Sequence, residues 1–397
     1  RRQRQMCIRD SVFGTPLLSL LAQARLLSDT ELGLAGSAVA LGLVYAVLAT
    51  WLWRAFPPAM HGLAEAFVAL AVGFGTMAIP FAFEASLTVA IAWALEGAGL
   101  YWVGLRQARR LARFSGIGLQ ALAAASFVLG AALNDLDWTP AWPVANGRFL
   151  SCLALALAGL FIAWQADARR TRIGAIEWWI AQALAAWALL WWALGVLSEI
   201  DGFVARPRQA AATVAMVGAS AFALEAAAAW RGWRFGRLLA LTAIPALVLL
   251  VPVVLDAVPH LLAHGGWIAW PFALGVVYRV VVRLESAGPP WAVRALAPAF
   301  WLLVLVVAMA LGGLAASPAG LTDDWAMGAA AFGGASVMLG ALYALERGRG
   351  PFGRHPRLHV GLAMAPVVAL AGLSWLVLNL AGRGDARPLP HVPLLNP

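Results

Sequence analysis

The sequence predicts an all-α integral membrane protein, a polytopic transmembrane helical bundle of about twelve complete spans plus one truncated span. Three observations support this fold class. The mean hydropathy of the 397-residue chain is +0.80, and 62% of its residues are apolar while 12% are charged. Apolar runs of membrane-spanning length recur along the chain, and the charged residues lie between them. A soluble domain of this size cannot bury so much apolar surface, so lipid is the expected solvent.

Twelve apolar runs are long enough to be complete spans. A helix rises 1.5 Å per residue, so about 20 residues cross a hydrocarbon core that is roughly 30 Å thick. In chain order the predicted spans are residues 33–53, 63–83, 86–105, 116–133, 148–166, 176–197, 209–230, 238–255, 266–284, 295–315, 325–345 and 359–381. They form one membrane domain over residues 12–397.

Arginine distribution between the spans predicts their orientation. The loops on one side, together with the span ends beside them, hold eighteen arginines, and the alternating set holds six together with most of the acidic residues. The eighteen are Arg54, Arg106, Arg109, Arg110, Arg113, Arg169, Arg170, Arg172, Arg231, Arg234, Arg237, Arg279, Arg283, Arg294, Arg347, Arg349, Arg354 and Arg357. Because cytoplasmic loops are enriched in basic residues, this side is predicted to be cytoplasmic, and residue 397 to lie outside.

Both ends of the chain differ from the interior. Residues 1–11 are polar and do not begin with methionine, so we interpret them as a non-native, adapter-like segment. The alternative is a genuine basic cytoplasmic segment. Residues 12–27 would then be the outer half of a truncated helix, and residues 388–397 a proline-rich loop. The chain is therefore expected to be the interior of a longer protein.

Net charge and cysteine content exclude several classes of protein. The formal net charge is +9 and the isoelectric point is about 11, but every basic residue is an arginine in a short cluster between apolar runs. That pattern indicates membrane topology, so no nucleic-acid partner is expected. Cys7 and Cys152 are the only cysteines, too few for a disulfide framework or a cysteine-based metal site.

A short motif recurs three times. Residues 93–96, 222–225 and 343–346 share the pattern aromatic-Ala-Leu-Glu, at separations of 129 and 121 residues. All three copies fall on predicted spans that run in the same direction and precede an arginine cluster. This spacing predicts parallel four-helix repeats of roughly 125 residues.

The stretch 13–133 carries a family resemblance. The residues that carry it are FGTPLL at 13–18, LAEAF at 63–67, AIPFA at 78–82, WALEGA at 93–98 and GLRQ at 104–107. The closing PLLNP at 393–397 also matches. The stretch 13–133 resembles a bacterial family of predicted membrane proteins without an assigned function, domain of unknown function 2339, and the middle of the chain resembles it mainly in helix rhythm. The resemblance implies an inner-membrane protein with many spans and longer ends. It implies no reaction, substrate or catalytic residue.

Glu96 is the first member of a candidate intramembrane polar site. It lies about ten residues from either end of its span, where an unpaired carboxylate costs several kcal/mol. It is a proton or substrate site between helices, or a carboxyl group whose hydrogen bond fixes helix packing, and the repeated motif favours packing. We expect it to be uncharged and buried against protein, with a partner on the helix at 63–83 or at 116–133.

Glu225 and Arg279 complete the candidate site. Glu225 lies near the arginine-rich end of its span, where pairing with an arginine is expected. Arg279 lies one helical turn inside Arg283, so it either extends to the membrane surface or pairs with Glu225. Glu65 and Glu177 lie in the first turns of their helices, where a carboxylate favours the helix N-terminus.

Asp256, His260 and His264 follow an i, i+4, i+8 spacing in a predicted outer loop. On a helix they would share one face, as metal ligands can, but Pro259 and the neighbouring glycines disfavour that helix. An interfacial loop is the preferred interpretation. The chain has no phosphate-binding glycine loop, nucleophile elbow or zinc-protease motif, so no catalytic residue, cofactor or metal is expected.

Two classes of function remain open. The favoured class is a non-enzymatic protein of the bacterial inner membrane, either an envelope scaffold or a carrier of lipid or a small solute. Its partners would be the lipid bilayer and other envelope proteins. The alternative is a membrane-embedded enzyme that acts on a lipid-linked substrate. Such enzymes usually place polar residues in outer loops, and the predicted outer loops are short.

Overall fold

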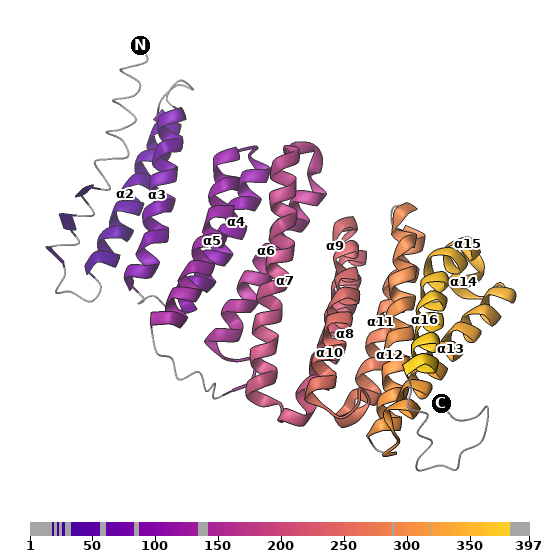
Figure 1. Cartoon of the computed structure of the whole chain (residues 1–397). Helices are drawn as coiled ribbons and strands as arrows, with labels where there is room; N and C mark the ends of the chain where they lie inside the picture. Colours follow the sequence, from indigo (N-terminus) through magenta and orange to yellow (C-terminus); the bar gives the residue numbers. More distant parts are fainter. Residues whose placement is uncertain are drawn as a thin grey trace. The chain divides into compact units, whose positions relative to one another are not determined.

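The protein is all-α, as the sequence predicts. The computed structural model describes residues 18–19, 22–23, 26–27, 33–55, 61–82, 87–133, 142–287, 290–317 and 319–381, and every regular element in these ranges is helical (Figure 1). In lipid a backbone amide has no water to pair with, so a helix, which pairs its backbone internally, is the expected form of an isolated apolar segment. The segments 1–11 and 388–397 lie outside the described residues.

Eleven helices among the described residues are long and apolar enough to cross a membrane. Their lengths of 20 to 29 residues match the thickness of a hydrocarbon core. A further apolar stretch, Ala66–Ala78, lies within α3 (His61–Ala82). The described chain is therefore a multi-pass membrane protein.

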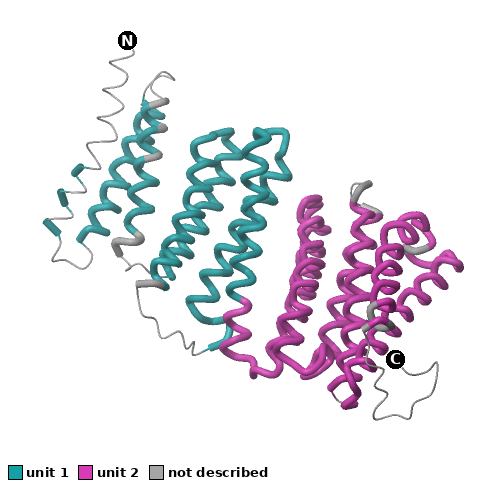
Figure 2. The backbone as a smooth tube through the Cα atoms, viewed as in Figure 1, with its two compact units in different colours: residues 1–195 teal, residues 196–397 magenta. Residues whose placement is uncertain are grey.

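The chain divides into two compact units, residues 1–195 and 196–397 (Figure 2). The long helix α7 (Ala175–Phe203) contains the boundary. Unit 1 also contains α2 (Gly33–Ala55), α3, α4 (Leu87–Arg106), α5 (Arg110–Leu133), α6 (Gly147–Ala168) and a 3-10 turn at Arg170–Arg172. Within unit 1, α2 pairs with α3 and α4 pairs with α5, and α6 packs on both α4 and α7.

Unit 2 starts with the last turns of α7. Its longer helices are α8 (Arg206–Arg231), α10 (Ala243–Ala257), α11 (Gly266–Ala287), α12 (Leu296–Ala316), α13 (Asp323–Glu346) and α16 (Ala365–Ala381). Shorter elements are α9 (Arg234–Leu239), α14 (Gly350–Arg354), α15 (Pro356–Leu358), a π-helical segment at His359–Met364 and 3-10 turns at Ala240–Thr242, Ala263–Gly265 and Pro290–Ala295. The core lies where α8 packs on α10 and α11, and α12 pairs with α13.

Small residues bring α4 and α5 into close contact. A Cβ atom added at Gly116 would lie 2.5 Å from the carbonyl oxygen of Gly97, so only glycine fits at this crossing. The fully buried Gln120 donates from Nε2 to the carbonyl oxygen of Ala94 at 2.7 Å. Close backbone approach and interhelical hydrogen bonds are the usual means by which helices associate in lipid, and this interface uses both.

Four predicted spans differ clearly from the structure. The predicted span 116–133 begins earlier, as α5 at Arg110, so Arg113, which was counted with the loop arginines, lies inside a helix. The predicted span 176–197 continues as α7 to Phe203, and α8 begins at Arg206 after only two residues. The predicted span 238–255 is α9 and α10 joined by the 3-10 turn at Ala240–Thr242. The predicted span 359–381 starts with the π-helical segment, whose Ala363 carbonyl accepts a hydrogen bond from Trp301 Nε1 at 2.9 Å.

Candidate functional site

Glu96 forms an interhelical hydrogen bond to α3. Its Oε1 lies 2.5 Å from the hydroxyl oxygen of Thr76, and Trp93 Nε1 donates to the Thr76 carbonyl oxygen at 3.2 Å. Thr76 is on one of the two helices where the sequence placed a partner for Glu96. The carboxyl group is half-buried.

The Thr76 hydroxyl has two neighbours that accept hydrogen bonds but only one proton of its own. It lies 2.9 Å from the carbonyl oxygen of Val72, one helical turn back, as well as 2.5 Å from Glu96. A threonine in a helix commonly donates to that carbonyl. Both contacts are then complete when the Glu96 carboxyl donates a proton of its own to the Thr76 oxygen. This geometry fits an uncharged carboxyl that joins α4 to α3.

A buried ion pair joins α5 to α7 and was not predicted from the sequence. Arg113 Nε lies 2.5 Å from Glu177 Oε1, and Arg113 Nη2 lies 3.0 Å from Oε2. The two side chains are 4% and 6% exposed. Two parallel charge-assisted hydrogen bonds of this kind fix both distance and orientation. The sequence had suggested only that Glu177 interacts with the N-terminus of its own helix. In the structure it also binds Arg113.

Arg113 reaches Glu177 because α4 leaves room for it. A Cβ atom added at Gly104 would lie 2.7 Å from Arg113 Cγ, and Arg113 Nη1 donates to the Gly104 carbonyl oxygen at 3.3 Å. The buried Tyr101 lies beside the same pair. A sequence signal existed, since Arg113 shares a helix face with the buried Gln120. An arginine on a buried stripe requires a partner.

Glu225 is the centre of a second ion-pair cluster, in unit 2. Its carboxylate is buried and lies 3.3 Å from Arg279 Nη2 and 3.6 Å from Arg283 Nη1, both on α11. The Arg279 guanidinium also lies over the ring of Phe222, 4.9 Å from its centroid. Pairing of Arg279 with Glu225, which the sequence left as one of two alternatives, is what the structure shows.

The three predicted site residues are thus in two places. Glu225 and Arg279 are in contact in unit 2, whereas Glu96 has its hydrogen-bond partner in unit 1. The third copy of the motif differs again, since Glu346 is exposed at the end of α13 and the neighbouring Arg347 guanidinium lies over the Tyr343 ring. The repeated pattern therefore gives three different carboxyl environments, and the four-helix repeat stays a prediction.

A third cluster lies at the end of α11. Glu285 Oε1 is 3.2 Å from Arg354 Nη1 and 2.9 Å from His355 Nε2. The Glu285 side chain is 8% exposed, whereas those of its two partners are 52% and 34% exposed. This contact attaches the short helix α14 and the turn after it to α11.

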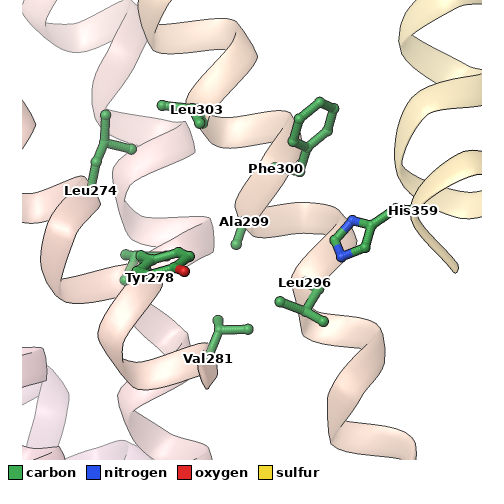
Figure 3. Close-up of a pocket in the computed structure, with 9 residues that line it drawn as sticks. Leu274, Tyr278, Val281, Leu296, Ala299, Phe300, Leu303 and His359 are labelled. Atoms are coloured by element: carbon green, nitrogen blue, oxygen red, sulfur yellow. The ribbon is translucent and has the colours of Figure 1, made fainter. Parts of the chain in front are cut away.

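A small apolar pocket lies in unit 2. Its volume is about 70 Å³, and its walls are aliphatic and aromatic side chains of α11 and α12 with the imidazole of His359 (Figure 3). His359 belongs to the π-helical segment and is 1% exposed. Pockets that enclose a drug-sized ligand usually measure roughly 300–1,000 Å³, so this one has room for only a small group or the end of a chain.

Asp256, His260 and His264 do not form one helix face. Asp256 lies in the last turn of α10, and His260 lies in the turn that follows. His264 adopts a left-handed φ of 47° in a 3-10 turn. Within the described ranges no three His, Cys, Asp or Glu side chains gather as metal ligands would. Cys152 is buried as a free thiol in α6, and Cys7 lies outside the described residues.

Comparison with known proteins identifies one family. The model of a family described as predicted membrane protein, DUF2339, matches residues 3–255. The match includes residues 3–11, which the sequence analysis set aside, and ends before PLLNP at 393–397. No curated protein and no solved structure matches the chain. Because the match covers more than half of the sequence, the chain belongs to the DUF2339 family of predicted membrane proteins.

Proposed function

We propose that this protein is a non-catalytic scaffold of the bacterial inner membrane. The observation that carries the proposal is that its intramembrane polar side chains bond to side chains of neighbouring helices. Glu96 bonds to Thr76, Arg113 to Glu177, and Glu225 to Arg279 and Arg283. Each of these contacts joins two helices of the same unit. A group that binds a transported solute or takes part in a reaction must instead present its polar atoms to a cavity.

The α4–α5 interface supports the same proposal. Gly97 and Gly116 are in direct contact, and the Gln120 amide nitrogen is bonded across the interface. The residues around Glu96 on α4 therefore support a fixed arrangement of helices. A scaffold needs such rigidity because its partners bind to surfaces whose positions must not change.

A carrier of lipid is the second candidate, and the apolar pocket beside His359 favours it. The end of an acyl chain could enter this pocket, which has Leu274 and Phe300 in its walls. The small volume of the pocket is the argument against this role. A test must therefore separate blocking of the pocket from damage to the fold.

The test compares Glu96→Gln and Ala299→Phe in cells that depend on the protein for growth under envelope stress. Glu96→Gln keeps hydrogen-bonding atoms but removes the titratable proton, and Ala299→Phe fills the pocket. Ala369→Phe, on the exposed face of α16, is the matched control. A scaffold tolerates all three substitutions. Loss of growth with Glu96→Gln or Ala299→Phe, at normal protein level and thermal stability, would contradict the scaffold and favour a carrier.

A further inference from the structure

We propose that Arg279 and Arg283 form a binding site for the phosphate group of an anionic lipid. The two guanidinium groups share one carboxylate, that of Glu225. Two positive charges and one negative charge leave the cluster with a net charge of +1. This inference concerns a ligand at one helix end and does not depend on the scaffold role.

The three side chains of the cluster differ in how far they are exposed. The Glu225 side chain is 3% exposed, whereas the side chains of Arg279 and Arg283 are 36% and 52% exposed. The carboxylate is therefore enclosed by protein, and both arginines extend past it to the surface of unit 2. An anion approaching from the surface meets guanidinium groups before it meets the carboxylate.

Arg279 has more hydrogen-bond donors than Glu225 can accept. A guanidinium carries five N–H groups. Only its Nη2 lies within hydrogen-bonding distance of Glu225. Its Nε is enclosed by protein, so the donors that remain for a ligand are the other N–H groups of Nη1 and Nη2. Arginine binds phosphate through two parallel N–H groups, and an added acceptor would satisfy donors that the protein leaves unused. The Arg279 guanidinium also lies over the Phe222 ring, and this contact helps to hold the group in position.

The surroundings favour a lipid over free phosphate. Arg279 and Arg283 lie one turn apart near the end of a membrane-spanning helix, the level at which lipid phosphates are found. Phe272 and Gly275 precede Arg279 on the same face of α11 and are exposed. A Cβ atom at Gly275 would meet nothing within 4 Å, so an acyl chain can lie along this face below the phosphate.

Nearby basic residues add to the attraction. Arg231 ends α8, Arg234 and Arg237 lie in α9, and α9 packs against both α8 and α11. Basic residues near a membrane surface attract anionic lipid electrostatically. The cluster at Glu225 differs from these neighbours because it offers two guanidinium groups held in place by a buried carboxylate.

The experiment measures binding of phosphatidylglycerol to the purified full chain in neutral detergent. Lipid retention is read by native mass spectrometry, and protection is read by the rise in Tm. Wild type should retain phosphatidylglycerol, and phosphatidylcholine should protect much less. Arg283→Gln keeps the Arg279–Glu225 pair and should still fold, with affinity reduced at least fivefold. Gly275→Leu tests the acyl-chain path separately and should also weaken binding.

The control is the double variant Arg349→Gln/Arg357→Gln, which removes two exposed arginines elsewhere at the arginine-rich end of unit 2. It should retain phosphatidylglycerol like wild type. Equal loss in this control would show diffuse electrostatic attraction and overturn the site. Protection by inorganic phosphate equal to that by phosphatidylglycerol would overturn the lipid assignment, as would wild-type affinity in Arg283→Gln.

Discussion

Glu96, Glu225 and Glu346 occupy the same place in one short motif, yet each carboxyl group has a different partner. Thr76 bonds to the first, two arginines of α11 bind the second, and the third is exposed. The motif alone therefore does not determine the chemistry of its glutamate. The helix that packs against it supplies either a neutral hydroxyl or a positive charge, and this decides whether the carboxyl is best neutral or charged.

Substitutions at Glu96 test its role in packing. Glu96→Leu removes the bond to Thr76 and should lower the free energy of unfolding by about 1 kcal/mol, the usual magnitude for an interhelical hydrogen bond in a membrane. Glu96→Gln retains a donor and an acceptor and should unfold like wild type. Unfolding is followed by circular dichroism in mixed micelles with increasing sodium dodecyl sulfate. Equal stability of all three proteins would show that the bond contributes nothing.

The Arg113–Glu177 pair should be far more sensitive, because both groups are buried. Glu177→Gln leaves the Arg113 charge without its counter-ion and should cost about 3–5 kcal/mol. The double variant Arg113→Met/Glu177→Met removes both charges and should recover most of that loss. The same denaturation assay measures both variants. If the double variant were as unstable as Glu177→Gln alone, the pair would be stabilising beyond the cost of an unpaired charge.

At the level of helices, the arrangement of α4 and α5 depends on which glycines face the interface. Gly116 contacts Gly97, whereas Gly118, two residues later on the same helix, has open space where a Cβ would lie. Successive side chains on a helix are rotated by about 100°, so two glycines this close can have opposite roles. The close crossing then allows Arg113 to reach past Gly104 to α7.

Gly116→Ala and Gly118→Ala form a matched pair. In Gly116→Ala the new methyl group would lie 2.5 Å from the Gly97 carbonyl oxygen, so the helices must separate, at a cost of about 1–3 kcal/mol. Gly118→Ala should be neutral or stabilising by up to about 1 kcal/mol, because alanine has the higher helix propensity. Thermal unfolding in detergent compares the two. A similar Tm for both variants would contradict the close crossing.

Elements were predictable from sequence to the extent that they depend on local composition. A run of about twenty apolar residues is sufficient to form a span, so the all-α class and most spans follow from the sequence. The π-helical segment at His359–Met364 is different. Its Ala363 carbonyl pairs with Trp301, which is 62 residues away, so this irregularity depends on tertiary contact. The extension of α7 to Phe203 includes Glu199 and Asp201, polar residues that a hydropathy window reads as a loop.

On the scale of the whole molecule, an ion pair in unit 1 joins the N-terminal ends of two helices, and an ion pair in unit 2 joins the C-terminal ends of two helices. Arg113 and Glu177 lie near the starts of α5 and α7, and Glu225 and Arg283 lie near the ends of α8 and α11. Such pairing agrees with alternating spans whose arginine-rich ends lie on one side. The sequence predicted Glu225 and Arg279 as candidate site residues because both lie within spans. It did not yield Arg113–Glu177, since nothing local shows that helices 64 residues apart in sequence are neighbours.

Single cysteines test this orientation. In a background with Cys7 and Cys152 replaced by alanine, Gln107→Cys should be protected from a membrane-impermeant thiol reagent, because it lies in an arginine-rich turn. Trp142→Cys should react from outside, since it lies in the opposite set of loops and is 72% exposed. Labelling is carried out on bacteria with a permeabilised outer membrane. Reaction at position 107 and protection at position 142 would reverse the proposed topology.

The pairings of α2 with α3, α4 with α5 and α12 with α13 also bear on how the chain is made. Each pair joins helices that follow one another and occupies about fifty residues. Ribosomes add roughly 5–20 residues per second, so each such hairpin emerges in a few seconds. Helix formation takes on the order of a microsecond, and local contacts form fastest. Each hairpin can therefore complete its own interface before the next one leaves the ribosome, so that synthesis sets the pace of assembly.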